Sequence, residues 1–191
     1  MNDLAFYFKE GWHHIISFDA LDHLLFIVAL TAVYILKEWK KVLILATAFT
    51  IGHSITLALS VYDVIRANEK CVELLIPLTI IITATSNFFI KDFNKKSWRI
   101  NYFFALFFGL IHGLGFANSI RFMLAGNQKI GNALFGFNLG LEAGQIICIA
   151  IILLSSYLAI DIARLKRNWW IFILSNVIIL WAVKFTLERI P

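Results

Sequence analysis

Histidines and acids that lie in apolar surroundings are the residues of this sequence best suited to chemistry. Three of the five histidines occur between His13 and His23, in the run HHIISFDALDH. If a helix begins near Asp19, then Asp19, Asp22 and His23 share one face at spacings of i, i+3 and i+4. Imidazole and carboxylate together form a ligand set for divalent transition metals. Asp19 is equally well placed to cap that helix, because a carboxylate at a helix N-terminus accepts hydrogen bonds from free amide groups.

Two more histidines lie deep in other apolar stretches, His53 in TIGHSIT and His112 in LIHGLG, and Glu142 lies deep in a third. An acid near the middle of a bilayer costs at least about 2.5 kcal/mol, so it needs a partner or a purpose. Small residues beside the histidines, such as Gly52 and Gly113, allow helices to approach closely. We therefore expect His53, His112 and Glu142 to meet at one level of the membrane. Each buried histidine alone would more often be a satisfied core group, and it is the set that indicates a site.

Several neutral polar residues accompany these candidates. Asn138, Glu142 and Gln145 fall at i, i+4 and i+7 on one helical face, and Ser54 follows His53 directly. We expect these residues to support the site, although Asn138 and Gln145 could instead only hydrogen-bond to a neighbouring helix. Thr79, Thr83 and Asn87 form another polar line, at i, i+4 and i+8, which could line a path or only hydrogen-bond to a neighbouring helix.

The composition indicates the kind of protein that must position these residues. Apolar residues make up 60% of the chain, charged residues only 15%, and the mean hydropathy is +0.80. These values exclude an ordinary soluble fold, a disordered chain and a nucleic-acid-binding protein. The net charge of +5 is what the orientation rule for membrane proteins produces, so it indicates topology rather than an acidic partner. The two cysteines cannot form a disulfide framework.

Apolar stretches of about 20 residues, the length that crosses a hydrocarbon core of about 30 Å, predict six membrane-spanning helices. Residues 1–18 are too short and too polar to cross, and they lack the features of a signal peptide, so we expect a short interfacial segment there. The fold class is therefore an all-α integral membrane protein, a six-helix bundle that forms one domain over residues 1–191. The expected crossings lie near residues 22–36, 42–61, 74–90, 101–123, 133–158 and 169–187.

Basic residues gather in the loops that follow the first, third and fifth expected crossings. Under the positive-inside rule these loops lie in the cytoplasm, and both termini lie outside it. The basic residues of the three loops are Lys37, Lys40, Lys41, Lys91, Lys95, Lys96, Arg99, Arg164, Lys166 and Arg167.

Five segments, in this order from about residue 11 to residue 145, resemble the HupE/UreJ family of small bacterial membrane proteins: GWHHIISFDALDHLLFIVAL, ATAFTIGHSITLALS, ELLIPLTI, FFGLIHGLGFANSI and FNLGLEAGQ. That family is regarded as metal permeases, chiefly for nickel or cobalt supplied to hydrogenase and urease. The resemblance implies roles for His14, Asp22, His23 and His112, a place in the bacterial inner membrane and a partner metalloprotein system.

Two features make the chain resemble a divergent branch of that family. In the nickel-associated members the first histidine lies closer to the Asp-His pair than His14 lies to Asp22 here. In those members the later motif also combines two His-Gly pairs with an acid. This chain has one such pair, His112-Gly113, and its acid, Glu142, falls on the next helix.

The leading hypothesis is a permease for a divalent transition-metal ion, either nickel, cobalt, zinc or iron, because imidazole ligands suit these ions better than magnesium or calcium. Asp22 and His23, with His14, would capture the ion at the outer face, and His53, His112 and Glu142 would receive it at mid-membrane. The expected partners are the metal ion and the lipid bilayer, with a homo-oligomer as a further possibility and no nucleic acid.

Two alternatives from other classes stay open. Three histidines, an acid and a neighbouring serine could hold a catalytic zinc ion with an open water position: His23, His53, His112, Asp22 and Ser54. Glu142 would then be the general base of an intramembrane hydrolase or transferase. The polar residues could also only fix helix packing in a non-catalytic membrane subunit that docks a partner. The leading hypothesis assigns no catalytic residue and no organic cofactor.

Overall fold

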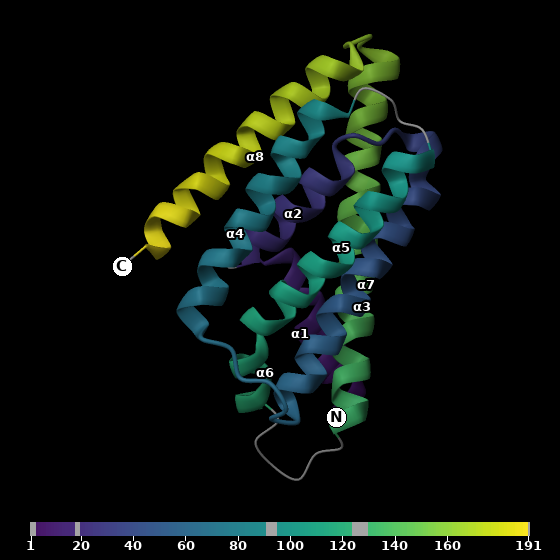
Figure 1. The fold of residues 1–191 in the computed structure, drawn as a ribbon. Helices are drawn as coiled ribbons and strands as arrows, with labels where there is room; N and C mark the ends of the chain where they lie inside the picture. The colour runs from purple at the N-terminus through teal and green to yellow at the C-terminus, as the bar shows by residue number, and fades with distance from the viewer. Residues whose placement is uncertain (1–2, 18–19, 91–94, 124–129, 191) are drawn as a thin grey trace.

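The protein is a bundle of α-helices, described here from a computed structural model of residues 3–17, 20–90, 95–123 and 130–190 (Figure 1). Every regular element in these residues is helical, which confirms the all-α fold class. The elements in chain order are α1 (Asp3–Ile16), α2 (Leu21–Thr31), η2 (Leu36–Glu38), α3 (Trp39–Val61), α4 (Glu69–Ser86), η3 (Asn87–Phe89), α5 (Lys95–Gly115), α6 (Ala117–Met123), α7 (Ile130–Tyr157), the π-helix η4 (Leu158–Ile162) and α8 (Arg167–Arg189).

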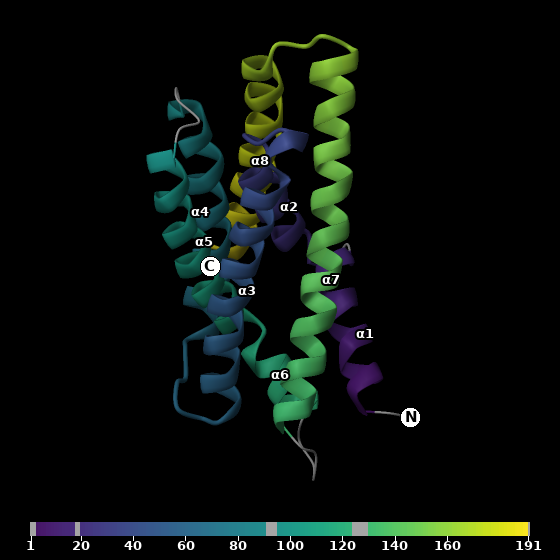
Figure 2. The same cartoon turned by 90° about the vertical axis from the view of Figure 1, so that its right-hand side faces the viewer.

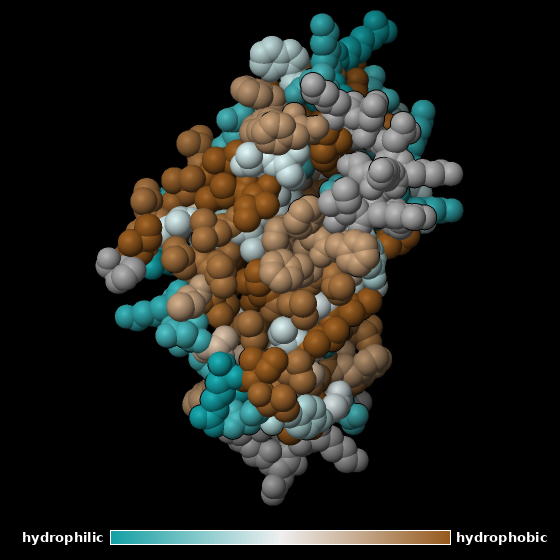
Figure 3. Space-filling model, in the orientation of Figure 1, coloured by the Kyte–Doolittle hydropathy of each residue, from teal (hydrophilic) through white to brown (hydrophobic). Residues whose placement is uncertain are grey.

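The number of membrane crossings follows from helix length and composition. Among the described residues, four helical segments are long and apolar enough to cross alone: Leu36–Val61, Glu69–Phe89, Ile130–Ile162 and Arg167–Arg189. Two bent helix pairs raise the number to as many as six. Apolar side chains cover the middle of the face in Figure 3, with hydrophilic ones gathered toward its two ends. These features are those of a multi-pass membrane protein.

The first crossing differs from the expected one at residues 22–36. Helix α2 has 11 residues, about 17 Å at 1.5 Å per residue, which is too short to cross alone. It reaches the length of a span only together with α1, from which it is bent by 68°. The fourth crossing is also bent, by 51° between α5 and α6, where a single helix over 101–123 was expected.

Helix α1, which occupies most of the expected interfacial segment, instead packs along α7 (Figure 2). A Cβ atom on Gly140 would lie 1.9 Å from the carbonyl oxygen of Phe8, and one on Gly11 would lie 1.9 Å from that of Phe137. The backbones of α1 and α7 are therefore in direct contact. Tyr7 of α1 is also buried. This close packing explains why the amphipathic start of the chain belongs to the bundle.

Glycines bring α3 and α5 together in the same way. A Cβ atom on Gly52 would lie 2.2 Å from the Leu106 carbonyl oxygen, and one on Gly113 would lie 2.4 Å from the carbonyl oxygen of His53. This result confirms that the small residues beside the two deep histidines allow close approach. The contact holds His53 on α3 and His112 on α5 at the same level of the bundle.

Candidate metal centre

Four histidines from four helices gather in the interior of the bundle. They are His14 of α1, His23 of α2, His53 of α3 and His112 of α5. The ring centroids of His14 and His23 are 4.5 Å apart, those of His23 and His112 are 5.0 Å apart, and those of His14 and His53 are 5.9 Å apart. We call these four side chains the histidine cluster.

Three members of the cluster have the geometry of a metal-ligand group. His14, His23 and His53 each offer one ring nitrogen, and these three atoms all lie within 4.8 Å of one another. Metal–nitrogen bonds of about 2 Å place two ligands of one ion roughly 3–4 Å apart. Side-chain rotations that move each nitrogen by roughly 1 Å would therefore bring the three nitrogens to ligand distance.

Most ring nitrogens of the cluster have no hydrogen-bond partner within the described part of the chain. The buried atoms without partners include His14 Nε2, His23 Nε2, His112 Nδ1 and both ring nitrogens of His53. Leaving a buried polar group unpaired costs about 1–3 kcal/mol. Several such groups at one place are therefore typical of a site that binds a ligand, because packing alone would not retain them.

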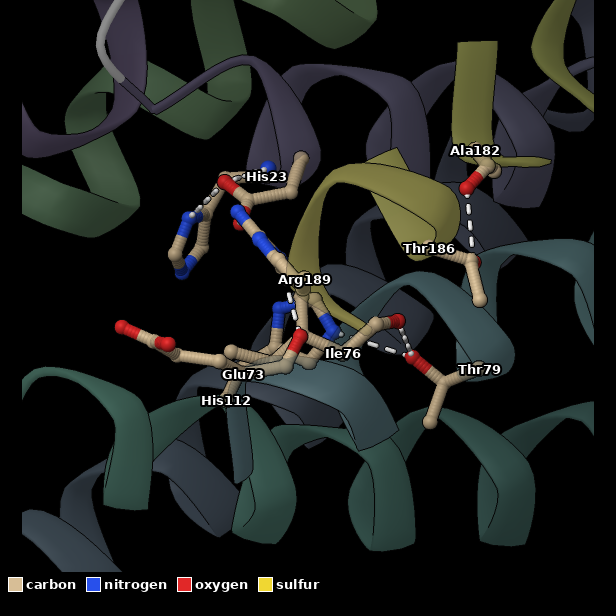
Figure 4. A network of polar contacts seen from close by, with 9 residues as sticks. His23, Glu73, Ile76, Thr79, His112, Ala182, Thr186 and Arg189 are labelled. Carbon is tan, nitrogen blue, oxygen red and sulfur yellow. Dashed lines mark hydrogen bonds and ion pairs between the residues drawn. The ribbon is translucent and has the colours of Figure 1, made fainter. Parts of the chain in front are cut away.

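The tautomer of His112 is fixed by a neighbouring hydroxyl group (Figure 4). Thr79 Oγ1 lies 3.1 Å from His112 Nε2 and also donates to the Ile76 carbonyl oxygen at 2.7 Å. Since a hydroxyl has one proton, the threonine must accept from Nε2–H, which leaves the lone pair on Nδ1. Hydrogen bonds of this kind orient histidine ligands in metal sites.

Aromatic rings surround the cluster. The Phe116 ring lies 4.1 Å from that of His14, and Phe137 stacks on His53 with an interplanar angle of 15° at 6.3 Å. Phe49 packs edge-on against His112 at 5.2 Å. These apolar rings form part of the wall around the cluster, beside imidazole groups that bind metal in their neutral form.

A cavity of about 610 Å³ leads from the surface to the cluster. Its walls include His14, His23 and His112, and also the exposed residues Lys9 and Glu73, so the cavity connects the interior with the outside of the bundle. An ion can therefore reach the cluster without passing through packed apolar side chains.

Asp22 lies beside the histidine cluster. Its Oδ1 atom is 3.3 Å from His23 Nδ1, and its Oδ2 atom is 3.2 Å from Arg189 Nη2. The carboxylate of Asp22 therefore orients the His23 ring and adds negative charge beside the cluster. Arg189 was missed, because a basic residue at the end of the last apolar stretch indicates only topology in the sequence.

A protein-family model described as HupE / UreJ protein matches residues 1–189. The chain belongs to the HupE/UreJ family. No curated protein and no solved structure matches it. The HupE/UreJ family is associated with nickel and cobalt transport, so a transition metal is the cargo expected at the level of the family.

Glu142, the acid of the fifth expected crossing, contacts a threonine in this HupE/UreJ protein and not the histidine cluster. Glu142 accepts a hydrogen bond from Thr47 at 3.0 Å, and it does not belong to the ligand group found among the described residues. Glu142 was expected to meet His53 and His112 at one level of the membrane. Its carboxylate instead contacts Thr47. On the same helix, Gln145 accepts a hydrogen bond from Thr50 of α3 at 2.9 Å. Gln145 therefore follows the alternative in which it hydrogen-bonds to a neighbouring helix.

The remaining supporting residues of this HupE/UreJ chain have separate surroundings. Ser54 donates to the Thr50 carbonyl oxygen at 2.6 Å, within α3. Asn138 Oδ1 is buried without a hydrogen-bond partner in the described residues. Asp19 lies outside the residues that the structure describes.

Proposed function

We propose that this chain is a permease for a divalent transition-metal cation of the nickel or cobalt kind, and that the cation binds at His14, His23 and His53. The observation that carries the proposal is the group of buried ring nitrogens without hydrogen-bond partners, contributed by separate helices within 4.8 Å of one another. Imidazole suits nickel, cobalt, zinc and iron, whereas magnesium and calcium prefer oxygen ligands.

His112 and Asp22 extend this site. The lone pair on His112 Nδ1 provides a fourth imidazole ligand, and the ring lies 5.0 Å from His23. Asp22 contacts His23 and supplies negative charge close to the ion. The cation would therefore enter through the large cavity, meet His14, His23 and His112 in its wall, and reach the fully buried His53 from there.

The polar line on α4 suits the inner half of the pathway. Thr79 contacts His112, and Asn87 at the other end of the line helps to line a second cavity of about 340 Å³ together with Asn168. Hydroxyl and amide oxygens at one-turn spacing can replace water around a partly dehydrated ion. The positive-inside rule would put this second cavity on the cytoplasmic side of the membrane, opposite the large cavity.

An intramembrane hydrolase is less well supported. That alternative needs a general base beside the metal, and the carboxylate expected to serve, Glu142, bonds to Thr47. We therefore keep the permease as the proposed function.

Metal accumulation in cells tests the proposal. Cells that express the wild-type chain should accumulate nickel, cobalt, zinc or iron above the level of empty-vector cells, measured by elemental mass spectrometry. The His53→Leu variant should accumulate no more than empty-vector cells. Ser54→Ala is the matched control, because its hydroxyl bonds within α3. Equal accumulation by His53→Leu and wild type, at equal amounts in the membrane, would remove the cluster from the pathway.

A further inference from the structure

The C-terminal end of α8 brings the guanidinium group of Arg189 close to His23 and Glu73 (Figure 4). Arg189 Nη2 lies 3.2 Å from Asp22 Oδ2, and Arg189 Nη1 donates to the Glu73 carbonyl oxygen at 3.0 Å. The arginine thus links α8 to the N-terminal turns of α2 and α4. It also lines the same cavity as His14, His23 and His112.

Asp22 has two kinds of partner. One carboxylate oxygen contacts His23, a candidate ligand, and the other contacts Arg189, a fixed positive charge. The Asp22 side chain is only 12% exposed, so the ion pair is weakly screened by water. A guanidinium is charged at every physiological pH, so Arg189 neutralises this carboxylate permanently while the contact lasts.

A divalent cation at His23 would feel both charges. The carboxylate attracts the ion and the guanidinium repels it, and both interactions act over a short distance in a partly buried site. A transport site must bind its ion strongly enough to load it and weakly enough to release it. A positive side chain beside the only carboxylate that contacts the cluster, among the described residues, provides such a limit on affinity.

We propose that Arg189 is a tethered counter-cation of Asp22, and that the incoming divalent cation competes with its guanidinium for this carboxylate. This inference rests on the proposed function, because it assumes that the histidine cluster binds a metal ion. Loading of the ion releases Arg189 from Asp22, which frees the C-terminal end of α8 from α2. Return of the guanidinium to Asp22 favours release of the ion.

Other charged groups of the cavity do not account for this effect. Lys9 is a basic residue that also lines the cavity, but among the described residues it forms no ion pair with Asp22. Glu10 and Glu73 line the cavity too, and as acids they cannot be counter-cations of a carboxylate. The competition is therefore assigned to Arg189.

Cobalt(II) titration of the purified protein tests the competition. Removing one positive charge from beside a dication should lower the cobalt dissociation constant of Arg189→Gln by at least about tenfold. Arg189→Lys keeps the charge and should bind cobalt like the wild type. Lys184→Gln is the matched control, because it removes one positive charge from the exposed side of the same helix, where Lys184 lies 3.7 Å from Glu188. Its dissociation constant should not change.

The outcomes separate this inference from the proposed function. A wild type that binds no cobalt overturns both. A wild type that binds cobalt, with Arg189→Gln binding no more tightly, overturns the competition alone and makes Arg189 a structural anchor. In that case Arg189→Gln should only melt at a lower temperature.

A second measurement uses the wild type and does not depend on the folding of a variant. Cobalt should increase the rate at which phenylglyoxal modifies Arg189, read by peptide mass spectrometry, because the ion releases the guanidinium from Asp22. Arg66 is the internal reference, since it pairs with Asp63 outside the cavity at 2.5 Å. An Arg189 rate that cobalt leaves unchanged relative to Arg66 contradicts the proposal.

Discussion

His53 and Gln145 are both buried polar side chains inside long apolar helices, yet their surroundings differ. Gln145 accepts a hydrogen bond from Thr50, so the packing of α7 on α3 satisfies its amide oxygen. Neither ring nitrogen of His53 has a hydrogen-bond partner among the described residues, although the residue is 0% exposed. In the sequence both are polar residues in apolar stretches, so only the fold distinguishes a ligand from a packing group.

This difference predicts opposite effects on stability. His53→Leu should leave the metal-free protein as stable as the wild type or stabilise it by about 1 kcal/mol, because leucine removes two unpaired buried nitrogens. The variant should lose the rise in melting temperature that cobalt gives the wild type. Thermal unfolding in detergent, with and without cobalt, measures both effects.

Gln145→Leu is the control for that experiment. It leaves the Thr50 hydroxyl without its acceptor, so it should destabilise the metal-free protein by about 1–3 kcal/mol and keep the cobalt-dependent shift. A His53→Leu variant that melts well below the wild type without metal would mean that the imidazole is a structural group.

At the scale of the helices, three of the four histidines of the cluster lie close to the bends of the two bent helix pairs. His14 is close to the C-terminal end of α1, His23 is in the first turn of α2, and His112 is in the last turn of α5. Interrupted helices are tolerated at membrane depth where they line a cavity. Here the ends of these helices line the large cavity. The ends of short helices thus bring side chains from different directions to one point.

The sequence predicted the apolar segments well and the bends poorly. Hydropathy over about 20 residues reports whether a segment can cross, so the crossings over 42–61, 74–90, 133–158 and 169–187 correspond to the four long helical segments. Neither bend contains a proline, whereas Pro77 lies inside α4 without breaking it. The bends follow from packing between helices distant in sequence, such as α1 on α7, which no local pattern reveals.

The contact between α1 and α7 should be sensitive to a single methyl group. Gly140→Ala would put a Cβ atom 1.9 Å from the Phe8 carbonyl oxygen, which forces α1 away and moves His14. We expect a loss of about 1–3 kcal/mol in stability and weaker cobalt binding. Gly131→Ala on the same helix meets nothing within 4 Å and should be neutral or slightly stabilising. Equal behaviour of the two variants in melting and cobalt titration would contradict the close contact.

For the whole molecule, the distribution of charge predicts the orientation in the membrane, and the fold forms the cavity that leads to the histidine cluster. The cavity is lined by Glu73 and Arg189, which lie at the N-terminal end of α4 and the C-terminal end of α8. Lys37 lies just before α3, whose other end leads through a loop to α4. The positive-inside rule therefore predicts that the cavity opens outside the cytoplasm. The sequence could give this orientation, but not the cavity, because its walls come from helices far apart in the chain.

Cysteine labelling tests this orientation, because Cys71 is exposed and lies two residues before Glu73 on α4. A membrane-impermeant maleimide should label Cys71 in intact spheroplasts. Lys37 lies just before α3, at the end of that helix that is distant from α4 in the chain. In a Cys71→Ser background, the cysteine introduced by Lys37→Cys should react only after permeabilisation. The reverse pattern would make the cavity open to the cytoplasm. The ion would then reach the histidine cluster from inside the cell, since it enters from the side on which the cavity opens, and the orientation predicted from the charges would be wrong.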